Sequence, residues 1–304
     1  MIRKIIISLN VYKNHLFITY LDGSIDIVKF QNFNYGFNKF SNLSYSDKIE
    51  NNELLNDVQP LQDNLIVLKN SKIFKINLQS NNQESLFKEK IFTQLWNNTE
   101  SKRLDILTTG NKINSISYGA NINQSRLIDR KIKISEKHIV SHMKSHKNNV
   151  FLSVRGYGVE ELTPWKKNSH RTQDAQDLEL SKKHNIIAVA DGLEGIVIFE
   201  TDNKKPIKKI TIGDEVCQEI STFQNMLIIK CKNGLFIYNL SSNKLTNIWN
   251  KSVGTYTTFN DMIFLSSENN IYMIPYTTAS EKHFRLYNDS IKINIENKIG
   301  RAHV

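Results

Sequence analysis

Residues 185–200 have the sequence NIIAVADGLEGIVIFE, two short apolar runs separated by an acidic, glycine-containing turn. Apolar runs rich in β-branched residues are typical of strands that are buried on both faces of a sheet. Asp and Gly residues between such runs tolerate the positive φ angles of a tight hairpin. The stretch therefore predicts two adjacent antiparallel strands in the interior of a sheet.

The same unit recurs along the whole chain. The turns of these hairpins fall near positions 23, 71, 111, 157, 193, 234 and 270, about 36 to 48 residues apart, which is the spacing of four-stranded propeller blades. One repeat shows all four strands, at Asp177–Leu180, Asn185–Ala190, Ile196–Glu200 and Pro206–Ile212. We therefore predict an all-β fold, a β-propeller of about seven four-stranded antiparallel blades, rather than a sandwich or a β-solenoid.

The rest of the chain fits one domain over residues 1–298. Helical periodicity is nearly absent, and residues 46–57 and 119–131 are expected to form loops. A propeller ring must join its first and last blades, because an open ring would expose strand edges. We expect Lys4–Val11 to be the innermost strand of the first blade and Lys282–Tyr287 the outer strand of the last. Ile291–Ile295 should add a further strand at the junction.

A resemblance to a known family rests on the residues 185–200 stretch and on Asp202-Asn-Lys-Lys-Pro206, a strand and Gly213 after it. Together they resemble one unit of the bacterial and archaeal LVIVD-repeat propellers. The match covers about one blade, residues 175–213, and Val154–Leu162 resembles a weaker copy. Most other blades lack the proline and the acidic turn. The resemblance implies a binding or surface-display scaffold with no common reaction.

Composition narrows the class of partner. The formal net charge is +10, but 32 of the 40 basic residues are Lys, and Lys, Asn and Ile share A/T-rich codons. A protein that reads bases would use more Arg, so we do not expect a nucleic-acid partner. No apolar run approaches the ~18 residues of a membrane span, and the N-terminus lacks a cleavage site typical of a signal peptide. We expect a cytoplasmic monomer.

The two cysteines are Cys217 and Cys231. They fall on two neighbouring predicted strands, roughly diagonal to each other. We expect them to be buried, unbridged hydrophobic side chains in a reducing compartment.

No catalytic or cofactor motif is present, and we assign no catalytic residue and no cofactor. Gly156-Tyr157-Gly158 begins like a dinucleotide loop, but a strand follows it where that motif needs a helix. His138, His142 and His146 are spaced four apart, which places them on one side of a helix or a strand. They are the candidate zinc or copper ligands, with a solvated basic strand and turn as the alternative.

A local excess of basic residues is the candidate partner surface. It could attract an acidic protein, although lysines that reflect codon composition are the alternative. Its members are Arg126, Arg130, Lys131, Lys133, Lys137, Lys144 and Lys147. The leading functional hypothesis is a non-enzymatic scaffold that binds a protein partner through loops on one propeller face. The alternative is an enzyme or a redox or metal accessory protein that uses the propeller channel.

The C-terminal residues Ile299–Val304 match a peptide that a common sequencing adapter encodes. We expect this segment to be a non-native tail that packs against nothing, with a natural tail that happens to match as the alternative. If the gene continues, the propeller of residues 1–298 is truncated at its C-terminus.

Overall fold

The computed structural model describes eighteen stretches of the chain. They are residues 5–12, 15–21, 24–29, 55–61, 64–69, 72–77, 82–87, 92–98, 102–108, 112–117, 127–133, 138–146, 148–163, 166–201, 203–259, 262–268, 270–275 and 291–293. The regular secondary structure in these stretches is entirely β. None of the described residues belongs to a helix that is long and apolar enough to cross a membrane.

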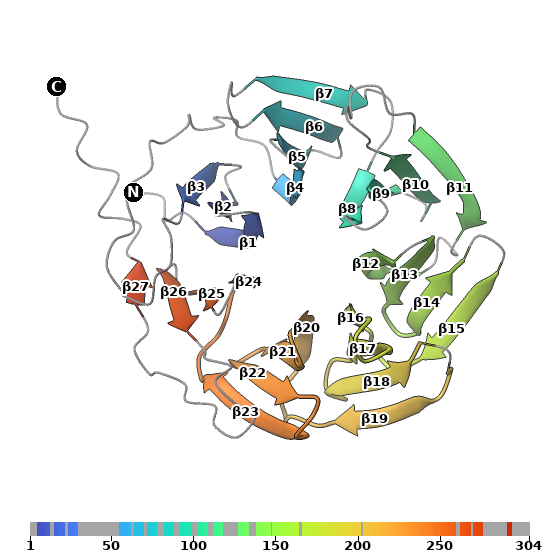
Figure 1. Ribbon diagram of the computed structural model, residues 1–304, viewed down its shortest axis with the longest axis vertical. Helices are drawn as coiled ribbons and strands as arrows, with labels where there is room; N and C mark the ends of the chain where they lie inside the picture. The colour runs from blue at the N-terminus through green and yellow to red at the C-terminus, as the bar shows by residue number, and fades with distance from the viewer. Residues whose placement is uncertain are drawn as a thin grey trace. The chain divides into compact units, whose positions relative to one another are not determined.

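Seven antiparallel sheets make up the described part of the chain, and in each the strands follow one another in chain order (Figure 1). The first sheet has three described strands and each of the others has four. Consecutive four-stranded sheets of this kind are the blades of a β-propeller, so the chain has the predicted seven-bladed propeller fold. The first three sheets are β1 (Ile6–Tyr12), β2 (His15–Tyr20), β3 (Ile25–Lys29); β4 (Leu55–Leu61), β5 (Asn64–Lys69), β6 (Lys72–Asn77), β7 (Gln83–Phe87); and β8 (Phe92–Asn98), β9 (Arg103–Thr108), β10 (Lys112–Ser117), β11 (Leu127–Lys133). The next two are β12 (Val140–His146), β13 (Asn149–Val154), β14 (Gly158–Leu162), β15 (Lys167–Arg171); and β16 (Asp177–Ser181), β17 (Ile186–Ala190), β18 (Ile196–Glu200), β19 (Pro206–Ile210). The last two are β20 (Cys217–Phe223), β21 (Met226–Cys231), β22 (Gly234–Asn239), β23 (Lys244–Trp249); and β24 (Tyr256–Phe259), β25 (Met262–Ser267), β26 (Asn270–Pro275), β27 (Ile291–Ile293).

The chain divides into two compact units, and unit 1 comprises residues 1–70, 74–84 and 252–304. Within it, the first sheet packs on the last one, because Leu9 and Ile18 share a buried cluster with Phe264 and Ile271. The first sheet also packs on the sheet of β4 to β7, through a cluster that contains Phe17 and Val67 among others. The first and last sheets of the chain are thus direct neighbours, as propeller closure requires.

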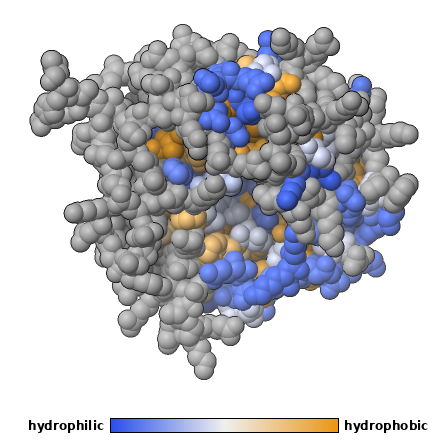
Figure 2. Space-filling model, turned by 45° about the horizontal axis from the view of Figure 1, so that its top comes forward, coloured by the Kyte–Doolittle hydropathy of each residue, from blue (hydrophilic) through white to orange (hydrophobic). Residues whose placement is uncertain are grey.

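Unit 2 comprises residues 71–73 and 85–251 and contains β8 to β23. Three buried clusters join its four sheets in succession: Leu107 with Leu152, Phe151 with Val189, and Ala190 with Ile229. Each fully buried Leu, Ile or Val contributes roughly 1.5–3 kcal/mol. On the face drawn in Figure 2, hydrophobic residues (orange) lie in recessed positions beside hydrophilic ones (blue).

The sheets of unit 2 have two different ends. The turns between first and second and between third and fourth strands lie at one end, which we call the hairpin end. The middle turns and the connections to neighbouring sheets lie at the other, the connector end. Side-chain and backbone bonds match this arrangement, because Lys183 Nζ donates to Asn225 Oδ1 (2.6 Å) at the hairpin end. At the connector end the Cys217 amide donates to the Gly192 carbonyl (2.9 Å).

In two of the sheets, glycine is required where the third strand begins. Gly195 has φ of 84°, and a Cβ atom there would lie 2.2 Å from the Ile210 carbonyl oxygen on β19. Gly158 has φ of 123°, and its Cβ would lie 2.1 Å from the His170 carbonyl oxygen on β15. The fourth strand therefore approaches too closely for any side chain at these positions.

The seven predicted hairpins are confirmed as the second and third strands of the seven sheets. The expected loops at residues 46–57 and 119–131 are wrong in part, because β4 begins at Leu55 and β11 at Leu127. β11 has the sequence LIDRKIK, which carries too few apolar residues to predict a strand. β1 is the first strand of its sheet as expected.

The last strand of the seventh sheet is β27, which pairs with β26. It overlaps the segment Ile291–Ile295 that the sequence predicts as a further strand. The segment expected as the outer strand, Lys282–Tyr287, and the expected tail Ile299–Val304 lie outside the described residues.

Candidate functional site

The first strands of the four unit 2 sheets, β8, β12, β16 and β20, repeat one pattern of residue types. A polar residue precedes a buried apolar residue, which is Leu95, Met143, Leu178 or Ile220. In β8, β12 and β20 a β-bulge lies directly before the polar residue. The polar residues at this shared position are Gln94, His142, Asp177 and Glu219. We call these side chains and the charged groups that pair with them the inner-strand array.

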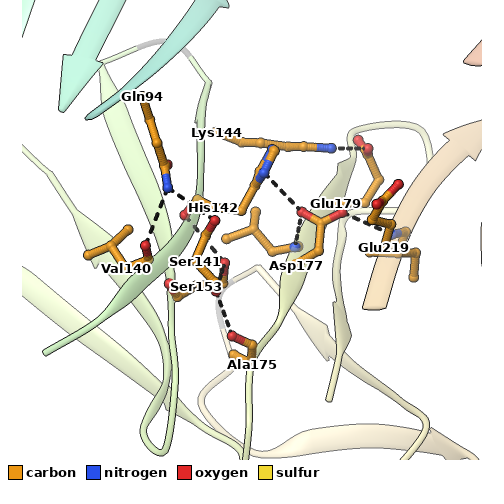
Figure 3. A network of polar contacts seen from close by, with 12 residues as sticks. Gln94, Val140, Ser141, His142, Lys144, Ser153, Ala175, Asp177, Glu179 and Glu219 are labelled. Atoms are coloured by element: carbon orange, nitrogen blue, oxygen red, sulfur yellow. Dashed lines mark hydrogen bonds and ion pairs between the residues drawn. The ribbon is translucent and has the colours of Figure 1, made fainter. Parts of the chain in front are cut away.

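Hydrogen bonds in the array step from one first strand to the next (Figure 3). Gln94 Nε2 on β8 donates to the Ser141 carbonyl on β12 at 3.1 Å. The Ser141 hydroxyl donates to the carbonyl of Ala175, just before β16, at 2.7 Å. The Ile220 amide on β20 donates to Asp177 Oδ2 on β16 at 2.9 Å. The array therefore joins all four sheets of unit 2.

Lys144 on β12 is a buried cation in this array. Only 7% of the residue is exposed, and its ammonium group forms an ion pair with Glu179 on β16. Burial by itself would lower the pKa of Lys144, but attraction to Glu179 and Asp177 outweighs burial and raises the pKa above its ordinary value. The ammonium group of Lys144 therefore keeps its charge at neutral pH, and its ion pair with Glu179 ties β12 to β16.

A second pair joins Lys230 on β21 to Glu219 on β20. Burial raises the pKa of Glu219 above its ordinary value, against the opposing attraction of Lys230. Because 41% of the Glu219 side chain is exposed, solvent reaches this carboxyl group and weakens the effect. His142 completes the array, with its Nδ1 atom 3.6 Å from Asp177 Oδ1.

Both ammonium groups of the array have a carboxylate partner, and the third carboxylate, that of Asp177, accepts two backbone amides. Matched pairs in an interior hold neighbouring elements in register, and removing one partner is costly. A catalytic group, by contrast, needs a nucleophile or base activated for transfer. The geometry therefore favours a structural role for the array.

The three histidines predicted as metal ligands have different neighbours. The ring of His138 packs on the ring of Tyr157, with centroids 4.9 Å apart, whereas His142 faces Asp177. His146 lies at the end of β12. Within the described ranges, no group of three or more His, Cys, Asp and Glu side chains is placed to hold a metal ion.

The residues of the predicted basic surface lie on two neighbouring sheets where the structure describes them. Arg130, Lys131 and Lys133 lie on β11, the last strand of its sheet, whereas Lys144 lies on the first strand of the next sheet. The prediction is wrong for Lys144, because the residue is buried and paired with Glu179. Arg126, Lys137 and Lys147 lie outside the described residues.

The connector end of unit 2 exposes large apolar side chains. Ile139 is 66% exposed and Leu193 is 68% exposed. Beside Ile139, the Arg171 guanidinium stacks on the Tyr157 ring at 3.6 Å, and His138 packs on the same ring. Tyr and Arg are enriched in protein interfaces, and exposed large apolar side chains rimmed by polar groups also mark interaction sites.

The turn that carries Leu193 is braced from several sides. The buried carboxylate of Asp191 accepts the backbone amides of Gln173 (3.1 Å) and Asp174 (2.6 Å) from the preceding connection. The Asp191 amide donates to the Gly195 carbonyl (2.8 Å) across the turn. A turn held in this way presents Leu193 in a fixed position, so little conformational entropy is lost on binding.

Comparisons with known proteins give the fold alone. No family model matches the chain, and no curated protein matches it. Among solved structures, the chain is similar to the crystal structure of the computationally designed Ika8 protein, with a TM-score of 0.64 and 11% sequence identity. The similarity covers 90% of this chain and 84% of that one.

Proposed function

We propose that this protein is a non-enzymatic β-propeller scaffold that binds a protein partner through the loops of its connector end. The observation that carries the proposal is the pair of exposed apolar residues, Ile139 and Leu193, on this end of unit 2. Apolar anchors surrounded by polar groups are typical of surfaces that are covered in a complex. The stack of Arg171 on Tyr157 supplies a second kind of anchor.

Rigidity supports the same function. The Ile139 carbonyl accepts the Arg155 amide at 3.0 Å, so its connection is held against the middle turn of the same sheet. The Leu193 turn is held by Asp191 and by the Cys217 amide. Preorganised anchors bind more tightly for a given buried area, because less freedom is lost.

The experiment is a comparison of three immobilised proteins in extract from the source cells. The test variant is Ile139→Asp/Leu193→Asp. The control is Ile207→Asp, because Ile207 is 50% exposed but lies on the outer strand β19. The wild type and the control should capture the same protein, and the test variant should capture at least about tenfold less, since a buried charge in an interface is strongly unfavourable. Equal capture by all three, or no captured protein, would overturn the proposal.

The alternative is an enzyme or a redox or metal accessory protein that acts at the first strands. The proximity of His142 to Asp177 favours it, since a carboxylate commonly orients a histidine that binds a metal. Metal analysis of the purified protein separates the two functions. Stoichiometric zinc or copper that disappears in His142→Ala would support the alternative.

A further inference from the structure

The hairpin end of unit 2 carries an excess of positive charge. Besides Lys167, which pairs with Glu160, its described turns and strand ends expose seven lysines against one exposed acid, Glu200. The lysines are Lys102, Lys166, Lys182, Lys183, Lys204, Lys205 and Lys244. The polar bond that Lys183 makes is to the amide oxygen of Asn225, so its positive charge is not neutralised there.

The connector end of the same unit differs. Its described residues expose six cations, Lys112, Arg155, Arg171, Lys209, Lys232 and Lys251, which are interspersed with acids. Asp214 is exposed there, and Asp174, Glu194 and Glu215 are half-buried. Codon composition would distribute lysine over both ends alike. The hairpin end nevertheless has the larger net excess of positive charge, which is the property expected of a binding surface for a negatively charged partner.

The exposed residue types at the hairpin end favour an acidic polypeptide over a nucleic acid as the partner. Nucleic-acid surfaces combine cations with aromatic platforms on which bases stack, and they favour Arg for base edges. The described residues of the hairpin end expose neither an arginine nor an aromatic side chain. They offer lysines on flexible stems, which suit the scattered carboxylates of an acidic polypeptide.

We propose that the hairpin end of unit 2 is a second docking surface, and that it binds an acidic segment of a protein. This surface lies at the opposite end of the sheets from the apolar anchors Ile139 and Leu193. A scaffold with two such surfaces can hold two proteins, or two parts of one protein, at the same time. Long-range attraction to the lysines would speed association and would weaken as salt concentration rises.

The test measures binding of a fluorescein-labelled polyglutamate peptide of about 20 residues by fluorescence anisotropy, at about 50 mM and about 300 mM salt. The test variant is Lys166→Gln/Lys204→Gln/Lys205→Gln. A matched variant, Lys112→Gln/Arg155→Gln/Lys232→Gln, removes the same net charge from the connector end. Circular dichroism melting checks that both variants fold.

The test variant should bind polyglutamate at least about fivefold more weakly than the wild type, and the matched variant less than about twofold more weakly. Equal losses in the two variants, or no binding by the wild type at low salt, would overturn the proposal. Tighter binding of a labelled single-stranded DNA of similar length through the same lysines would replace it with nucleic-acid binding. Because Ile139→Asp/Leu193→Asp leaves these lysines intact, it should keep polyglutamate binding even if the connector end proves not to bind a partner.

Discussion

Replacing Asp177 with alanine should destabilise the protein more than replacing any exposed acid. Asp177 is 6% exposed, and its carboxylate accepts two buried backbone amides, from Leu178 at 2.7 Å and from Ile220 on the next sheet at 2.9 Å. Alanine at this position leaves both donors without a partner. It also removes the carboxylate that faces His142.

The expected magnitude follows from these two amides. An unsatisfied buried donor costs about 1–3 kcal/mol, so Asp177→Ala should lower the free energy of unfolding by about 3 kcal/mol. In a chain of this size that loss lowers Tm by roughly 5 °C. Asp177→Asn keeps one oxygen acceptor and should lose only part of this stability.

Urea unfolding, followed by circular dichroism and by tryptophan fluorescence, measures the effect. Asp214→Ala is the control, because Asp214 is exposed at the connector end of the same unit. The control should remain within about 0.5 kcal/mol of the wild type. A loss of less than about 1 kcal/mol in Asp177→Ala would show that the array does not join the sheets.

Three further predictions concern single sites. Cys217 and Cys231 lie directly opposite each other, buried and free, and hydrogen bonding and burial raise the pKa of Cys231. Thiol labelling of the native protein should therefore be slow. Denaturation without reductant should reveal two free thiols, and a count of none would refute this. Burial by itself would raise the pKa of Glu161, but its polar partners lower it. Its charged form therefore stabilises the fold at pH values above the unfolded-state pKa. Glu161→Gln should lower the free energy of unfolding by about 1 kcal/mol at pH 7, and by progressively less as pH falls through the folded-state pKa. A loss that does not change with pH would contradict this. Gly195→Ala should cost roughly 2–4 kcal/mol in thermal unfolding, because its Cβ would meet backbone, whereas Gly156→Ala, with nothing within 4 Å, should cost less.

The sequence predicts the fold because the second and third strands of each sheet form one hairpin, and the residues that indicate this hairpin are close together in the chain. Apolar β-branched runs and turn residues lie next to each other in the chain, so no knowledge of distant contacts is needed. β11 lacks these signals, since an outermost strand needs few apolar residues and its sequence LIDRKIK resembles a loop. The predicted diagonal placement of Cys217 and Cys231 is wrong for a related reason. A bulge between Cys217 and Glu219 shifts the register and places the two cysteines directly opposite each other.

The inner-strand array could not be predicted from the sequence. β12, with the sequence VSHMKSH, suggests a solvated basic strand, because its charge partner Glu179 lies 35 residues away on the next sheet. The repeated order of a polar residue followed by a buried apolar one in β8, β12, β16 and β20 is the signal that could have revealed it. The exposure of Ile139 and Leu193 likewise depends on turns whose bracing partners are distant in sequence.

Hydrogen–deuterium exchange of the protein alone and in complex with its captured partner tests the central claim most directly. Binding through the connector end should slow exchange of the backbone amides in the turn around Leu193 and in the turn around Tyr157. Peptides from the outer strand β19 should exchange at unchanged rates. Unchanged exchange in both turns while the partner is bound would contradict the proposed docking surface.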